Sequence, residues 1–313
     1  MTLSLLKNLL RSVGVLLAVT FATFALMYGN GPGIARGVLG INASEEQVRQ
    51  EVIRLGLDQP LLVQYWSWLQ GAVTGDLGNS FFTSEPVTNA LSTRVPVTLS
   101  LVSFTLVLMI LLSVLLGVAS ALYGGWLDRT VQLVAVGGAA LQPYVVGIVL
   151  VFAFAVIWRI FPATGYVSPA KGIGPWISSI TLPVIALLIG SVANAASQFR
   201  SAVNDTLHQD FVRTLRARGI PEHHIVFRHV LRSASGPGLI ALSLGVIGLF
   251  GGAIFVEQIF ALPGLGQLVT NSAQQGDVPM VMGAILVTIV LILIVNFIAD
   301  LVGAALNPKA RIR

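Results

Sequence analysis

Long apolar runs alternate with short polar segments along the whole chain. Eight stretches free of charged residues come close to, or exceed, the length of about 20 residues that a helix needs to cross a bilayer. Six of them have apolar cores that end before glycine, proline or polar residues: 12–35, 95–127, 130–158, 172–199, 233–256 and 278–299. This pattern predicts six transmembrane helices and an all-α membrane protein.

Two further stretches have nearly the length of a span but not its composition. Residues 59–75 carry three glutamines and two nearby tryptophans, which is typical of an amphipathic helix in water or at an interface. Residues 258–276 contain a Pro-Gly pair followed by a polar half. We expect a short helix in the first stretch, and a loop with a short helix in the second.

Composition strengthens this interpretation. The chain is 55% hydrophobic and only 10% charged, whereas soluble domains carry about 25% charged residues. Its mean hydropathy is +0.85. No cysteine is present, which excludes disulfides and thiolate metal sites.

The net charge of +5 raises the question of a nucleic-acid partner. In a membrane chain, an excess of lysine and arginine on cytoplasmic loops gives the same balance. No motif known to recognise nucleic acid surrounds the basic residues. We therefore expect contact with the lipid bilayer and no nucleic-acid binding.

The distribution of basic residues predicts the orientation in the membrane. If the N-terminus is cytoplasmic, the inner segments hold 12 of the 18 lysines and arginines and the outer segments hold 6. Both termini are therefore expected in the cytoplasm. Lys7 and Arg11 precede the first apolar run as in a signal peptide, but no small-x-small cleavage site follows, so we expect a retained anchor helix.

Residues 30–94 form the longest outer segment and are predicted to fold into a small helical lobe between spans 1 and 2. Within "ASEEQVRQEVIRLGL", Ser44 and Gln47 have the spacing of a capping box. Gly56 is placed to end that helix. With no long internal repeat or low-complexity linker, residues 1–313 are interpreted as one membrane domain.

The cytoplasmic loop 201–232 concentrates polar residues that are otherwise rare. Its segment "DFVRTLRARGIPEHHIVFRH" holds four of the 18 basic residues and three of the four histidines. An apolar stripe of Leu207, Phe211 and Leu215 predicts an amphipathic helix. Gly219 fits a helix C-terminus and Pro221 fits the first turn of a second helix. The apolar side of this second helix is expected to hold Ile225, Phe227, Val230 and Leu231.

Periodicity alone leaves two roles open for this loop. An amphipathic helix with basic flanks can lie on anionic lipid. It can also dock into a groove of a soluble partner.

The loop resembles the cytoplasmic loop of ABC importer permeases, in particular the first permease subunit type of the dipeptide, oligopeptide and nickel systems. That loop typically runs Asp-aromatic-Val-Arg-Thr-Ala-Arg-Ala-Lys-Gly, followed by Arg-His-x-Leu-Arg. The matching residues are Asp210, Val212, Arg213, Thr214, Arg216, Ala217, Gly219, Arg228, His229, Leu231 and Arg232. Leu215 replaces the usual alanine, and Arg218 the usual lysine.

Other segments resemble the same family in the expected order. They are "LGLDQPLLVQYWSWL", "GDLGNSF", "VPVTLSL", "FPATGY", "TLPVIAL", "VEQIFALPGLGQLV" and "GDVPMVMG". Three departures concern the outer lobe, the third span and the tail. "GPGIARG" lacks a Pro-Gly-Asp-Pro pattern, Gln142 stands where a small residue is common, and Asn307 stands where aspartate is usual.

The resemblance implies a type I ABC importer permease fold and a role as half of a path for dipeptides or oligopeptides. The implied partners are a second homologous permease, two ATPase subunits and an external solute-binding protein, in the inner or plasma membrane of a prokaryote. Loop 201–232 would hold the coupling helix, which sits in a cleft of one ATPase and moves when ATP closes the ATPase dimer. The implied coupling residues are Asp210, Arg213, Thr214, Arg216, Ala217, Arg218 and Gly219.

Alternatives to a peptide permease remain at this point. The same scaffold imports nickel or another small solute in related systems, and a stand-alone channel or carrier is a less favoured interpretation. The only lysines, Lys7, Lys171 and Lys309, lie outside any G-x-x-x-x-G-K-[ST] pattern, so ATP and Mg²⁺ are expected on the partner ATPases and no cofactor on this chain.

Catalytic and metal-binding signatures are absent from the sequence. It contains no H-E-x-x-H or G-x-S-x-G motif, so we expect a non-catalytic subunit and no metal site. Glu257 and Asp300 lie near predicted span ends, where they are candidates for a gate or for structural contacts.

Overall fold

The computed structural model describes residues 2–28, 31–40 and 42–306, apart from some side chains within the helices. Helices dominate this part of the chain, and its β-structure is one isolated bridge between Asn79 and Pro86. The predicted all-α class is confirmed. The chain divides into two compact units, Met1–Thr98 with Pro263–Leu291 (unit 1) and Leu99–Leu262 with Ile292–Arg313 (unit 2). The division falls inside two long helices, α5 (Val87–Tyr123) and α13 (Val278–Leu306).

Unit 1 contains the predicted outer lobe. Its helices, besides the first parts of α5 and α13, are α1 (Thr2–Tyr28), α2 (Gly31–Leu39), α3 (Glu45–Arg54), α4 (Leu61–Thr74) and α12 (Leu265–Gln275). The capping box of α3 is present, with Ser44 and Gln47 each bonded to the other's backbone. Gly56 follows the end of α3 with φ +67°, as its predicted stop position requires.

A core of apolar side chains joins the lobe of unit 1 to its membrane helices. Phe24 of α1 and Tyr65 of α4 pack in one cluster with Val278 and Met282 of α13. The Tyr65 hydroxyl also lies 2.9 Å from Oγ1 of Thr20. A buried polar contact adds to this core.

That polar contact is made by Asp277, the residue before α13. It is only 3% exposed. Its carboxylate accepts hydrogen bonds from the Ser80 hydroxyl and, at 3.2 Å, from the Phe81 amide. These bonds compensate a buried charge and fix the segment before α5 against the start of α13.

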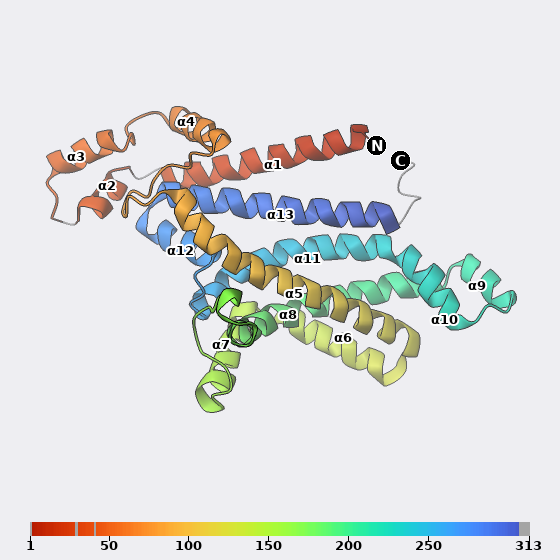
Figure 1. The fold of residues 1–313 in the computed structure, drawn as a ribbon. Helices are drawn as coiled ribbons and strands as arrows, with labels where there is room; N and C mark the ends of the chain where they lie inside the picture. The colour runs from red at the N-terminus through yellow and green to blue at the C-terminus, as the bar shows by residue number, and fades with distance from the viewer. Residues whose placement is uncertain (1, 29–30, 41, 307–313) are drawn as a thin grey trace. The chain divides into compact units, whose positions relative to one another are not determined.

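Unit 2 is a helical bundle that includes the remainders of α5 and α13. Its other elements are α6 (Gly125–Ala140), α7 (Pro143–Leu150), the π-helical η1 (Val151–Ile157), the 3₁₀ turn η2 (Pro169–Lys171), α8 (Ile173–Leu207), α9 (Asp210–Ala217), α10 (Glu222–His224), the π-helical η3 (Ile225–Val230) and α11 (Leu231–Ile259). Figure 1 shows α8 and α11 running side by side, with α6 against α8. A β-carbon at Gly138 of α6 would lie 3.0 Å from the Ile189 carbonyl of α8, so glycine permits this close packing.

Each of the six predicted spans overlaps at least one helix among the described residues, but the six-span count remains a prediction. Four helical stretches among the described residues are long and apolar enough to cross a membrane: Leu10–Tyr28, Val87–Tyr123, Ile173–Leu207 and Val278–Ala299. The sharply bent pair Asp128–Gly138 and Pro143–Ile157 makes a fifth if it forms one span. The predicted span 233–256 lies in α11, whose described apolar stretch, Gly245–Ile259, is shorter.

The two stretches set aside as non-spanning are short helices. The first forms α4, with 14 residues, and the second contains α12, with 11 residues. Both are shorter than the roughly 20 residues that a spanning helix needs.

Candidate coupling site

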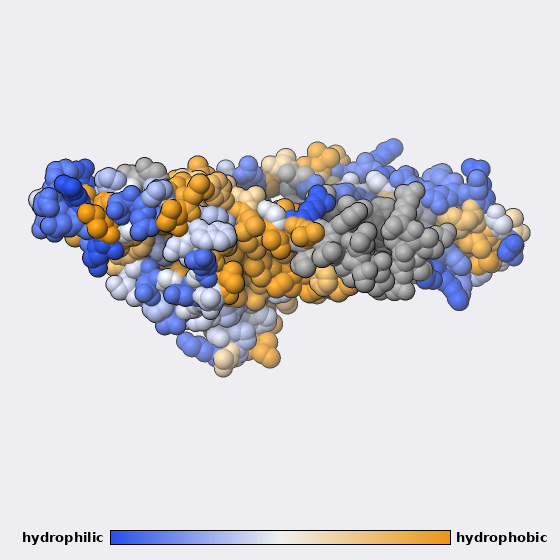
Figure 2. All heavy atoms as spheres, turned by 90° about the horizontal axis from the view of Figure 1, so that it is seen from above, coloured by the Kyte–Doolittle hydropathy of each residue, from blue (hydrophilic) through white to orange (hydrophobic). Residues whose placement is uncertain are grey.

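Five of the seven predicted coupling residues lie on α9, a short helix between α8 and α10, and Arg218 and Gly219 follow its end. Helix α8 ends at Leu207, and the chain turns through His208 and Gln209 before α9 begins at Asp210. Figure 1 shows α9 and α10 together beyond the ends of α8 and α11. In the space-filling view, hydrophilic residues cover much of the right-hand end, where α9 and α10 lie (Figure 2).

One face of α9 is anchored in the core of unit 2. Val212 is completely buried, in a cluster with Val203 of α8 and with Ile225 and Val230 of η3. Phe211 and Leu215 pack against the same cluster and are partly buried, as is Ile220 beyond the helix. An eight-residue helix has little stability of its own, so these contacts are what hold α9 in place.

The end of α9 has the geometry of a Schellman motif. The Ile220 amide donates to the Leu215 carbonyl at 3.3 Å, and the Gly219 amide donates to the Arg216 carbonyl at 2.9 Å. Gly219 has φ +73°, a backbone conformation that disfavours residues with a β-carbon. The predicted helix end at Gly219 is therefore confirmed.

The other face of α9, together with the turn that follows it, presents all seven predicted coupling residues. Asp210, Arg213, Thr214, Arg216, Ala217, Arg218 and Gly219 are all exposed. The Asp210 side chain is 99% exposed and the Arg213 side chain 73%, although Nη1 of Arg213 lies 3.8 Å from Oδ1 of Asp210. This surface is accessible to a partner protein, while the buried face of α9 holds the helix in the core of unit 2.

A bidentate ion pair joins α9 to α10. Arg216 donates from Nε to Glu222 at 3.0 Å and from Nη2 to the second carboxylate oxygen. The hydrogen bonds from Arg216 lower the pKa of Glu222, and the same bonds raise the pKa of Arg216. The sequence did not indicate this pair, because its members lie six positions apart and on either side of a turn.

The structure corrects three details of the predicted loop. The stripe of Leu207, Phe211 and Leu215 does not lie on one helix, since the chain turns at residues 208–209 between α8 and α9. Phe227 is 68% exposed, and Val226 is buried in its place. Residues 225–230 are π-helical, and the wider π turn changes which side chains face the core. Pro221, predicted in the first turn of the second helix, is instead the N-cap of α10, just before its first helical residue.

A cavity of about 900 Å³ opens beside the exposed face of α9. Its apolar wall includes Val118 and Leu122 of α5, and its polar wall includes His208, Arg213 and Arg216. The combination of apolar and basic walls is compatible with both predicted roles of the loop, at a lipid surface or in a protein groove.

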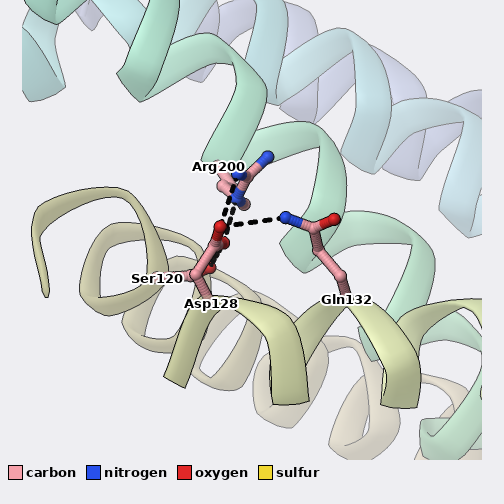
Figure 3. Close-up of polar contacts among 4 residues, drawn as sticks. All are labelled: Ser120, Asp128, Gln132 and Arg200. Carbon is pink, nitrogen blue, oxygen red and sulfur yellow. Dashed lines mark hydrogen bonds and ion pairs between the residues drawn. The ribbon is translucent and has the colours of Figure 1, made fainter. Parts of the chain in front are cut away.

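A second polar cluster lies where α5, α6 and α8 meet (Figure 3). Arg200 of α8 donates from Nε and Nη2 to the two carboxylate oxygens of Asp128, at the start of α6. Asp128 also accepts from Ser120 of α5 and, at 3.0 Å, from Nε2 of Gln132. Sequence reasoning missed this cluster. Its only signal was an aspartate and an arginine, each at the end of an apolar stretch.

The two candidate gate residues are not brought to α9. Glu257 is fully buried in the last turns of α11. Asp300 belongs to α13, but its side chain lies outside the described part of the structure. Among the described residues, no group of three His, Cys, Asp or Glu side chains could hold a metal ion.

The fold defines a class: an all-α protein with several helices that are long and apolar enough to cross a membrane. Family models for binding-protein-dependent transport systems match the chain, the inner membrane component over residues 113–312 and its N-terminal part over residues 1–102. The chain therefore belongs to the family of inner membrane components of binding-protein-dependent transport systems. With its several apolar helices it is a multi-pass inner membrane protein.

Several relatives align over nearly their whole length. A putative peptide transport system permease of Brucella abortus (strain 2308) is 33% identical, over 99% of both chains. The oligopeptide transport system permease AppB of Bacillus subtilis (strain 168) is 31% identical, over 97% of this chain and 98% of its own. A probable peptide ABC transporter permease of Sinorhizobium fredii (strain NBRC 101917 / NGR234) is 30% identical, over 98% of both.

Proposed function

We propose that the chain is a permease subunit of an ATP-driven importer and forms half of its path for dipeptides or oligopeptides. The similar proteins are named as peptide or oligopeptide permeases and align end to end. In this proposal a second homologous permease completes the path, and an external solute-binding protein delivers the peptide. Two ATPase subunits bind ATP and Mg²⁺ in the cytoplasm, on the side of both termini.

The observation that carries this proposal is the construction of α9. Its outer face exposes charged and small residues from Asp210 to Gly219, and its inner face is fixed by the buried Val212. An attachment of this kind lets a partner displace α9 only by displacing the helices behind it. Movement of an ATPase cleft would thus reach α8 directly and α11 through η3.

The proposal that separate subunits bind ATP agrees with the sequence of this chain. No lysine lies in a phosphate-binding loop. The subunit would therefore convert movement at α9 into a change of the spans without performing a covalent step. Asp210, Arg213, Thr214, Ala217 and Gly219 would contact the ATPase, with Arg216 and Arg218 as electrostatic support.

A peptide is favoured over nickel as the solute. The similar proteins are named as peptide or oligopeptide permeases.

Purification from the native membrane in mild detergent tests the proposal. Mass spectrometry of the bound proteins should find a second permease of this family and ATPases with phosphate loops. Recovery of the chain alone, or only as a homo-oligomer, under conditions that preserve other transporters would contradict it.

A further inference from the structure

A polar notch lies in unit 2 at the level of the predicted spans. It is a cavity of about 380 Å³ between the break of α6 and α7, the middle of α8, and α11. Four of its lining residues carry uncharged polar side chains: Gln142, Ser191, Asn194 and Gln198. The remaining lining residues are apolar or glycine, and none is charged.

The place of these side chains on α8 is unusual for a membrane helix. Ser191, Asn194 and Gln198 fall at i, i+3 and i+7, so they share one face. Asn194 and Gln198 are exposed, although α8 is apolar enough to span the membrane. Polar groups facing hydrocarbon are costly, and such residues in spans usually face a protein neighbour or a water-filled cavity.

The opposite wall keeps the notch open. Gly245 and Gly248 of α11 line it without side chains. A β-carbon at Gly248 would meet no atom within 4 Å, so close packing within the described chain does not explain this glycine. A larger residue here would instead occupy the notch.

We infer that this notch is a segment of the solute path and that it takes the peptide backbone, an inference that rests on the proposed function. Carboxamide and hydroxyl groups can both donate and accept hydrogen bonds, as the amides of a peptide do. Uncharged groups of this kind bind any peptide sequence weakly, which permits release. A metal cation finds no imidazole or carboxylate among the lining residues.

The absence of cysteine allows a direct test by thiol labelling. Asn194→Cys and Gln198→Cys are introduced separately, in the assembled transporter in its native membrane. Leu111→Cys on α5 is the matched control. Leu111 is 53% exposed and lies 12 residues before the end of α5 at Tyr123, while Asn194 lies 13 residues before the end of α8 at Leu207.

Each variant is treated with a charged, water-soluble methanethiosulfonate, which reacts with thiolate formed in water. We expect both notch cysteines to react at least about 10-fold faster than the control cysteine, because apolar surroundings suppress thiolate formation. A transported peptide should slow the reaction at the notch several-fold and leave the control unchanged. Full labelling of every variant in denaturing detergent shows that each cysteine is present.

Two results would overturn the inference. One is a reaction at Asn194→Cys and Gln198→Cys as slow as at Leu111→Cys, both without nucleotide and with the transporter trapped by an ATP analogue. The other is a fast reaction that peptide does not slow. If ATPases co-purify with the chain but the notch fails either labelling test, the notch is not part of the solute path, and the proposal of an ATP-driven importer still holds. If the notch cysteines are labelled quickly and protected by peptide but no ATPase co-purifies, the assignment of the notch to the solute path holds and the proposal of ATP-driven import is contradicted.

Discussion

Asp128 and Arg200 show how a single carboxylate can hold three helices of unit 2 together. The carboxylate accepts from Arg200 on α8, Ser120 on α5 and Gln132 on α6. The two charged side chains are only 17% and 26% exposed. A partly buried charge that keeps all its partners is tolerated, but one that loses its counter-charge destabilises the fold.

Asp128→Asn is therefore expected to lower the Tm of the purified protein by several degrees, since Arg200 stays in place without its counter-charge. Thermal unfolding in detergent, followed by intrinsic fluorescence, measures the change. In the double variant Asp128→Asn/Arg200→Gln, much of the loss should be recovered. A loss of Tm in the double variant equal to the summed losses of Asp128→Asn and Arg200→Gln would show that the residues are not coupled.

At the scale of single elements, the stability of α9 comes from its surroundings. It has eight residues, too few for an isolated helix, and it depends on Val212 behind it and on the pair of Arg216 with Glu222 at its end. The ion pair is half exposed, so its effect is local rather than global.

The lowered pKa of Glu222 predicts how the contact between α9 and α10 responds to pH. A depressed folded-state pKa gives stabilisation that is present above the ordinary glutamate pKa of about 4.3. It is lost as the pH falls through the folded-state value. A spin label on Ala217→Cys should thus become mobile only in acid, at a pH below the ordinary glutamate pKa.

Glu222→Gln is the matched control for that measurement. It removes the charge but keeps the size of the side chain, so the label on Ala217→Cys should already be more mobile at pH 7 and should respond little to acid. An unchanged mobility at pH 7 in this variant would show that the Arg216 pair does not hold α9.

Several element boundaries could be predicted from local chemistry, and others could not. Ser44 and Gly219 act through bonds to residues a few positions away, so their roles can be read from short spacing. The break at residues 208–209 and the π turn at 225–230 depend on how α9 packs against the core. No spacing along the chain encodes that packing, which is why the predicted orientation of Phe227 was wrong.

At the scale of the whole molecule, charge distribution and hydropathy decide the arrangement across the membrane. The 12-to-6 distribution of basic residues predicts cytoplasmic termini, and α9 is then cytoplasmic as well. Neither the charge distribution nor the hydropathy predicts the polar contacts between distant segments. The bonds of Ser80 to Asp277 and of Asp128 to Arg200 depend on helix packing, not on sequence spacing.

The predicted orientation leads to a labelling experiment in intact cells. Glu85→Cys, in the outer segment, should react with a membrane-impermeant maleimide added outside. Asp205→Cys, in the last turn of α8 and not among the proposed ATPase contacts, should react only after the membrane is permeabilised. Both positions are exposed, so access rather than burial limits each reaction. Labelling of Asp205→Cys from outside would reverse the proposed topology.

The most direct test of α9 as the coupling element uses Gly219→Val in the complete transporter. Valine at φ +73° costs about 1–2 kcal/mol or more in backbone strain and disturbs the end of α9. Gly75→Val is the matched control, since Gly75 has φ +87°, ends α4 with the same pattern of bonds and also has open space around it.

The quantity to measure is peptide uptake per ATP hydrolysed in proteoliposomes, with membrane insertion of both variants checked first. We expect Gly219→Val to insert normally and to lose most uptake per ATP, while Gly75→Val keeps the ratio of the unaltered protein. Normal uptake by Gly219→Val, at an unchanged ratio, would contradict the assignment of α9 as the element that couples the ATPases to the spans.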